Sequence, residues 1–140
     1  MPSGTGTGAI SEDASHVYSP INISGSCTLE NITINANNCR YAIHDETSGD
    51  TTFKGAIKKY KNVRVNRYTT YFTSNRYKHN DAFACGFDDE MQFTFENCNF
   101  YADTNGTPFR FHDRGTARTT ITVNNCVIRG NGANRSMVRL

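Results

Sequence analysis

The sequence predicts an all-β fold, a parallel β-helix of about four coils with three short strands in each, and three observations lead to this prediction. A six-residue pattern with an asparagine at its third position occurs four times. Its copies lie 31, 35 and 28 residues apart, a spacing typical of repeat proteins. No segment has the period of a helix, and apolar residues instead alternate with polar ones in short runs.

The repeated pattern runs apolar, polar, Asn, apolar, polar, apolar, except that the fifth position of the last copy is Val127. Asparagine tolerates the left-handed backbone conformation and its side chain can bond neighbouring backbone, so it suits a sharp bend that recurs in every coil. We therefore expect a corner at each of these asparagines and a ladder of stacked amides along the coil. The ladder residues are Asn31, Asn62, Asn97 and Asn125.

Short alternating segments flank each corner, rich in Thr, aromatic and aliphatic residues as in half-buried strands. Those before the corner are 27–29, 93–95 and 121–123, and those after it are 32–34, 63–65, 98–100 and 126–128. A third strand is expected at 41–43, 71–73, 109–111 and 137–139. Stacking these segments in register gives two inward columns, formed by Ile32, Val63, Cys98 and Cys126 and by Ile34, Val65, Phe100 and Ile128.

The corner pattern, the third strand and the loop that follows it resemble the right-handed parallel β-helix of the pectin lyase-like superfamily. The resemblance covers residues 17–140, and residues 1–16 are expected to form a flexible N-terminal segment. It implies a scaffold shared by polysaccharide lyases, glycoside hydrolases, adhesins and bacteriophage tailspikes. The motifs of polygalacturonases and pectate lyases are not found in this sequence, which makes those two activities doubtful.

Composition excludes several classes of function. A net charge of +2 predicts no strong field for nucleic acid or for an anionic membrane. No apolar run is long enough to span a bilayer, and the first residues lack the pattern of a signal peptide. The five cysteines show no CxxC or CxxH spacing, so we expect buried free thiols and neither a metal nor another cofactor.

A His-Asp pair occurs twice behind a third strand, in YAIHDE and in FRFHDR. In the predicted stack both pairs face outward on one flank, two coils and roughly 10 Å apart, with Ser74-Asn75 between them. Carboxylates at such a separation could serve an inverting glycosidase, with histidine as proton carrier. The alternative is that these residues only end the strand and turn the chain. The candidate catalytic residues on this flank are His44, Asp45, His112 and Asp113.

One long insertion, at about residues 74–90, is expected to project from the second coil. Loops on a rigid scaffold often carry function, although this one could equally be a solvated loop packed on the strands beneath. Together with residues 66–73 before it, this insertion brings together aromatic and basic residues that suit stacking on sugar rings and bonding of hydroxyl or acidic groups, namely Arg67, Tyr68, Tyr71, Arg76, Tyr77, Lys78 and His79. Further acid candidates are Asp88, Asp89 and Glu90.

The expected function is a structural, glycan-recognising β-helix of a bacteriophage tail or spike, located in the virion tail or outside the cell. A polysaccharide lyase or glycoside hydrolase, and a non-catalytic bacterial adhesin, are the alternatives. Uncapped ends of a repeat array expose sheet edges. We therefore expect a homo-oligomer, a trimer in the case of a tailspike, or adjoining β-helix segments, with a surface polysaccharide as ligand.

Overall fold

The structure, a computed structural model, describes parts of the chain, and the regular secondary structure found there consists of β-strands. Those parts are residues 19, 21–37, 41–46, 55–68, 81–87, 90–102, 107–113, 119–130 and 138–139. The strands are β1 (Ile21–Ile23), β2 (Cys27–Asn37), β3 (Tyr41–Glu46), β4 (Ile57–Tyr68), β5 (Asp81–Phe87), β6 (Gln92–Glu96), β7 (Asn99–Ala102), β8 (Phe109–Asp113), β9 (Thr120–Asn124), β10 (Val127–Gly130) and β11 (Val138–Arg139).

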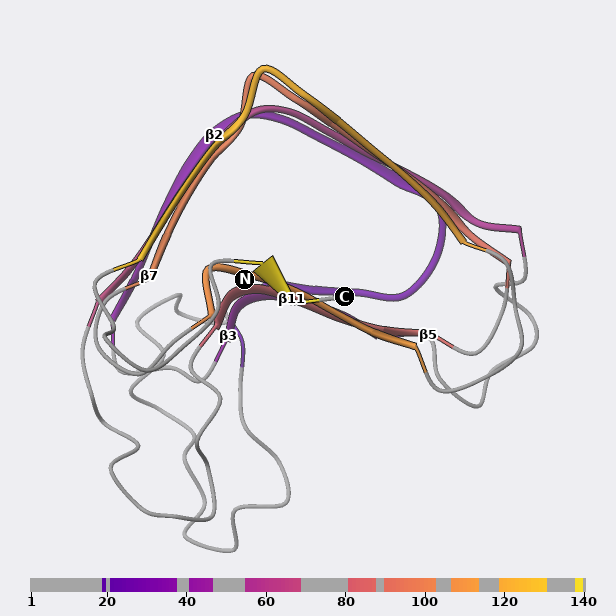
Figure 1. Cartoon of the computed structure of the whole chain (residues 1–140), viewed down its shortest axis with the longest axis horizontal. Coiled ribbons are helices and arrows are strands. Elements are labelled where there is room, and N and C mark those ends of the chain that lie inside the picture. The colour runs from indigo at the N-terminus through magenta and orange to yellow at the C-terminus, as the bar shows by residue number, and fades with distance from the viewer. Residues whose placement is uncertain are drawn as a thin grey trace, which may run out of the picture.

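The strands form two parallel sheets that face each other (Figure 1). The five-stranded sheet has the order β1-β3-β5-β8-β11. The six-stranded sheet has the order β10-β7-β4-β6-β9, with β2 paired to β4, and it is bent so that its strands cover two sides of the core. The prediction of an all-β chain with parallel pairing is therefore confirmed.

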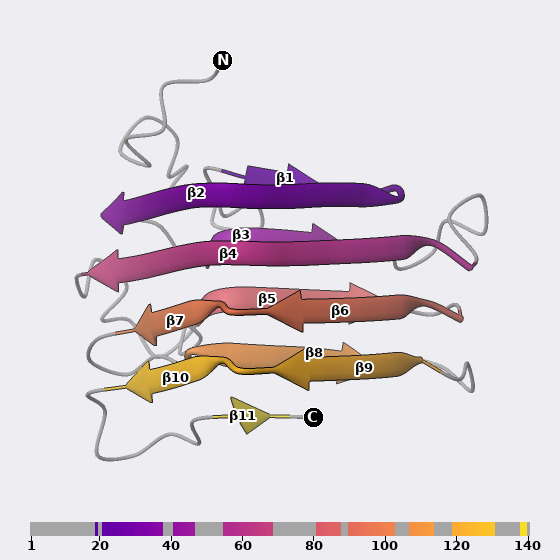
Figure 2. The ribbon, with the colours of Figure 1, turned by 90° about the horizontal axis from the view of Figure 1, so that it is seen from above.

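The chain alternates between the two sheets, and each return adds a strand beside the previous one (Figure 2). The pairing keeps one register throughout the described strands. Ile34 lies beside Val65, Val65 beside Phe100, and Phe100 beside Ile128. Residues of one kind therefore stack into columns, as the repeat predicts.

The four repeated asparagines all have a positive φ, with values of 55° at Asn31, 52° at Asn62, 53° at Asn97 and 49° at Asn125. The predicted left-handed conformation is thus confirmed at every corner. Their side chains also bond along the stack. The Nδ2 of Asn62 donates to the Oδ1 of Asn31 at 2.9 Å, and the Nδ2 of Asn125 donates to the Oδ1 of Asn97 at 2.7 Å.

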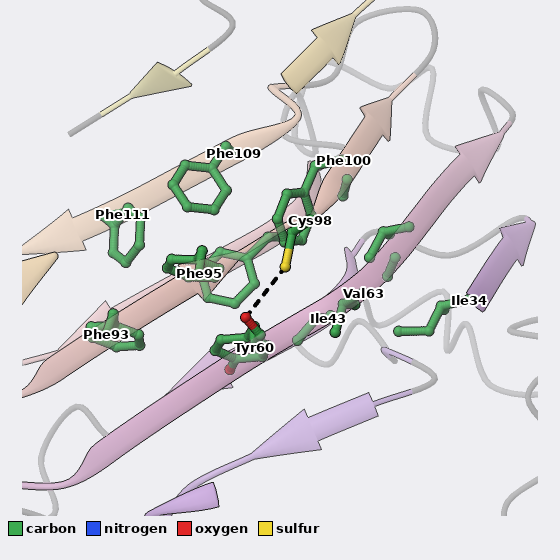
Figure 3. Close-up of a cluster of buried hydrophobic side chains, with 14 of the residues drawn as sticks. Ile34, Ile43, Tyr60, Val63, Phe93, Phe95, Cys98, Phe100, Phe109 and Phe111 are labelled. Carbon is green, nitrogen blue, oxygen red and sulfur yellow. Dashed lines mark hydrogen bonds between the residues drawn. The ribbon is translucent and has the colours of Figure 1, made fainter. Parts of the chain in front are cut away.

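Aromatic rings fill the space between the two sheets (Figure 3). Tyr60 and Phe95 stack face to face in neighbouring layers, with ring centroids 4.8 Å apart. Phe83 of the five-stranded sheet meets both of them edge-on, at 5.4 and 5.2 Å. Burying each such ring contributes about 1.5–3 kcal/mol, and the pair geometry adds about 0.5–1.5 kcal/mol. The contact between rings from both sheets holds the sheets together.

The predicted inward columns are also confirmed. Val63 and Cys98 are buried in the first column, and Val65 and Phe100 in the second. The Sγ of Cys98 lies 3.4 Å from the carbonyl oxygen of Tyr60 (Figure 3), and burial raises the pKa of this thiol to about 11. Cys98 is therefore a buried core residue. Cys27 and Cys126 are free thiols too, while the side chains of Cys39 and Cys85 lie outside the described residues.

The third strand of the second unit is not where the sequence predicts it. The strand between β3 and β8 is β5, Asp81–Phe87, and not residues 71–73, which lie outside the described part. The predicted insertion at 74–90 therefore contains a strand of the five-stranded sheet. In the segment DAFACGF, small residues separate the apolar ones, so it lacks the polar contrast by which a half-buried strand is recognised.

No helix in the described residues is long and apolar enough to cross a membrane.

Replacing Asn62 by Ala should destabilise the chain by about 1–2 kcal/mol for the left-handed backbone, in addition to the lost ladder bond of about 0.5–1.5 kcal/mol. Asn62→Gly should cost less, because glycine adopts a positive φ readily. Asn66→Ala is the matched control. Asn66 donates an equivalent 2.9 Å bond to Asn35 but is not among the residues with positive φ. Urea denaturation of the three variants measures the difference, and equal losses in Asn62→Ala and Asn66→Ala would contradict a backbone role.

Candidate functional site

The two His-Asp pairs do not occupy the same register positions. His44 on β3 lies beside Ala84 on β5, and Ala84 lies beside Arg110 on β8. His112 instead lies beside Gly86, which is the neighbour of Glu46. The prediction that the pairs stack in one row, with Ser74-Asn75 between them, is therefore wrong by two residues along the strand. The side chains of His112 and Asp113 lie outside the described residues.

The expectation that Asp45 faces outward beside His44 is also wrong. Neighbouring residues of a strand point to opposite faces, so His44 is half-buried on the outer face while Asp45 is fully buried in the core. Its carboxylate forms an ion pair with the Nζ of Lys58 on β4, which is fully buried as well. The Oδ2 of Asp45 also accepts a 2.6 Å bond from the hydroxyl of Tyr60.

Lys58 is the residue that sequence reasoning missed. Aligning the repeats places it in the inward column of Cys27, Phe93 and Ile121. A lysine in that column needs a partner, because burial of an unpaired ammonium is costly. Asp45 supplies this partner from the facing column, where its neighbours are Ile23 and Cys85. The Nζ also donates to the carbonyl oxygen of Ser24 at 3.3 Å.

Burial raises the pKa of Asp45. The positive charge of Lys58, and the hydrogen bonds that Lys58 and Tyr60 donate, lower this pKa and oppose the rise. Burial likewise raises the pKa of the neighbouring Cys27 thiol, and the carboxylate of Asp45 adds to the effect. The cluster of Asp45, Lys58 and Tyr60 joins the two sheets inside the core. It is a structural ion pair closed off from solvent, and this position does not suit a carboxylate that must meet a polysaccharide.

A different cluster is formed by His44 and Arg110, on the outer face of the five-stranded sheet, with Tyr41, the first residue of β3. Strict alternation would point Tyr41 inward with Ile43, but its ring contacts both of these outer side chains. The rings of Tyr41 and His44 stack with centroids 4.7 Å apart and planes inclined by 23°. The guanidinium of Arg110 lies 5.4 Å from the centroid of Tyr41 and donates a 2.9 Å bond to its hydroxyl. Tyr41 is buried, whereas His44 and Arg110 are half-exposed. A buried ring therefore fixes two basic side chains at the surface.

A second arginine lies over a tyrosine on the other sheet. The guanidinium of Arg129 on β10 is 6.0 Å from the ring centroid of Tyr101 on β7. Arg129 is exposed, and Tyr101 is half-buried. Its row continues through Asn66 and Asn35 on the outer face of the six-stranded sheet.

Most of the predicted insertion residues cannot be placed. The residues that lie outside the described part are Tyr71, Arg76, Tyr77, Lys78, His79, Asp88 and Asp89. The side chains of Arg67 and Tyr68, at the end of β4, are not described either. Glu90 is described, exposed, and borders a shallow pocket with Gly55, Gln92 and Thr120. Its carbonyl oxygen accepts the backbone N–H of Gly55. In the described part of the chain, no three His, Cys, Asp or Glu side chains converge as metal ligands do.

Comparisons with protein-family models, with curated proteins and with solved structures found no match.

Lys58→Met should destabilise the chain by about 3–5 kcal/mol at neutral pH, because it leaves a buried carboxylate without its counter-ion. Lys58 lowers the pKa of Asp45, so its loss raises that pKa further above the ordinary 3.8. When folding raises the pKa of a carboxyl group, the folded state loses stability as the pH rises through the raised value. The loss in free energy of unfolding caused by Lys58→Met should therefore be small near pH 3.8 and grow as the pH rises. Urea denaturation across this range measures it.

Two controls accompany this test. Lys59→Met changes an exposed lysine on the same strand and should stay within about 0.5 kcal/mol of the wild type. The double variant Asp45→Leu/Lys58→Met removes both charges, and it should recover most of the loss. A pH-independent deficit in Lys58→Met would mean that Asp45 does not become the unpaired charge.

Proposed function

We propose that the chain is a right-handed parallel β-helix of the pectin lyase-like kind, and that it serves as a glycan-binding segment of a bacteriophage tail or spike protein. The alternation of strands between two parallel sheets supports the fold, as does the left-handed asparagine that recurs in each layer. A stack of this kind is rigid, because each layer pairs with its neighbours along both sheets. It presents repeated outer faces on which a long polysaccharide could lie.

The observation that carries the binding proposal is the cluster of Tyr41, His44 and Arg110. His44 and Arg110 sit two strands apart, roughly 10 Å, on the outer face of one sheet. A guanidinium forms strong bonds with carboxylate groups, and an imidazole bonds hydroxyl or acidic groups. An acidic cell-surface polysaccharide is therefore the ligand class that fits the cluster best.

Recognition without cleavage fits this flank better than catalysis. Asp45 would be the carboxylate next to His44, yet it is fully buried and paired with Lys58. A general acid or base must come within hydrogen-bond reach of its substrate. A lyase or hydrolase would need carboxylates other than Asp45, and we do not propose one for this face.

Arg110→Ala should weaken binding to an acidic polysaccharide at least tenfold, a change of about 1.4 kcal/mol. Arg129→Ala is the matched control, because it removes an arginine above a tyrosine on the other sheet and should leave the affinity within about twofold. Biolayer interferometry against panels of acidic and neutral capsular polysaccharides measures both variants.

Three outcomes would contradict the proposal: equal affinity for acidic and neutral polymers, an unchanged affinity in Arg110→Ala, or an equal loss in Arg129→Ala. Release of new reducing ends or unsaturated products in the same incubations would favour the enzyme instead.

A further inference from the structure

In the last layer of the stack, residues of the inward columns are exposed to solvent. Phe95 and Phe109 are fully enclosed, but the next residues in their columns are Val123 and Val138, which are 44% and 42% exposed. Both valines occupy inward positions of their sheets. This end of the core is therefore an apolar surface next to the outer edges of β9, β10 and β11, which pair with no further strand in the described part of the chain.

The first layer is open over part of its length, although Ile34 is buried there. Leu29 and Ile32 are half-exposed, although the residues beside them in the next layer, Tyr60 and Val63, are 1% exposed. Ile21 on β1 is half-exposed too, at the head of the column that ends in Val138. Both ends of the stack thus present members of the same apolar columns.

The asparagine ladder gives the two ends opposite polarity. In each bond the Nδ2 of the later layer donates to the Oδ1 of the earlier one, as from Asn62 to Asn31 and from Asn125 to Asn97. Among the described residues, the ladder therefore ends with the Nδ2 donor of Asn31 in the first layer and the Oδ1 acceptor of Asn125 in the last. A donor end matches an acceptor end, so the first layer of one chain fits the last layer of another.

Continuing the observed register across such a contact produces compatible neighbours at every position. Val123 would lie beside Leu29, Thr122 beside Thr28, and Ile128 beside Ile34, because these residues already share columns within one chain. The charges also agree. Among the described residues, Glu30 is the charged residue of the first layer, and Arg129 and Arg139 are those of the last layer, so no like charges of these residues come together.

We propose that a second copy of this chain docks head to tail, with β1 and β2 of one copy pairing in parallel with the edges of β11 and of β9 and β10 of the other. The contact joins two different surfaces, so it can repeat and extend the stack in a row. The proposal rests on the observed register and exposure, and it does not depend on the glycan-binding role.

The test is a sedimentation series on the full chain over a range of concentrations. The wild type should rise from the 15.6 kDa monomer to at least twice that mass. Val123→Lys blocks one end and Leu29→Lys blocks the other, so each variant alone should stay monomeric. An equimolar mixture should form a 1:1 dimer, because one free end of each kind remains, and growth should stop there.

Thr122→Lys is the matched control, since Thr122 is exposed on the outer face of the same strand, and it should associate as the wild type does. Circular dichroism checks that every variant is folded, and Ile21→Lys on β1 replaces Leu29→Lys if that variant is not. A wild type that stays monomeric at all concentrations would overturn the proposal. So would self-association of either single-end variant, or a loss in Thr122→Lys as complete as that in Val123→Lys.

Discussion

The structure depends on one left-handed asparagine in every layer. A strand with strict alternation would place residues 29, 31 and 33 on one face, yet Leu29 and Ile32 both belong to inward columns. The positive φ of Asn31 produces this change of phase, as it bends the six-stranded sheet around the core. Because the same bend recurs at Asn62, Asn97 and Asn125, the strands before and after it stack in one register. The core and the outer faces follow from that register.

In-register stacking separates the requirements of the inside from those of the outside. Inward columns must match in size and polarity from layer to layer, which is why Lys58, a lysine in an inward column, is paired with an aspartate from the facing sheet. Outward rows have no such requirement, so they can carry Tyr41, His44 and Arg110 on one face and Tyr101 with Arg129 on another. A binding surface can therefore change while the scaffold stays the same.

The fold could be predicted from the sequence further than the site could. The asparagine pattern gave the corners and the inward columns, because the physical constraint there is local. The third strand at β5 could not be recognised from the sequence, because Ala82, Ala84 and Gly86 give no polar contrast. The duplicated His-Asp motif suggested a shared row, but register is set by pairing, which places Phe111 beside Cys85 and Cys85 beside Asp45. Alternation alone could have shown that His44 and Asp45 face opposite sides.

The central claim is that the corner asparagines fix a parallel, in-register stack. Nuclear Overhauser contacts between backbone protons of paired strands test it most directly in solution. A parallel, in-register stack should give contacts that link Ile34 to Val65, Val65 to Phe100 and Phe100 to Ile128 in the parallel pattern. It should also give couplings typical of a positive φ at Asn31, Asn62, Asn97 and Asn125. Contacts in an antiparallel pattern, or a register shifted by one residue, would contradict it.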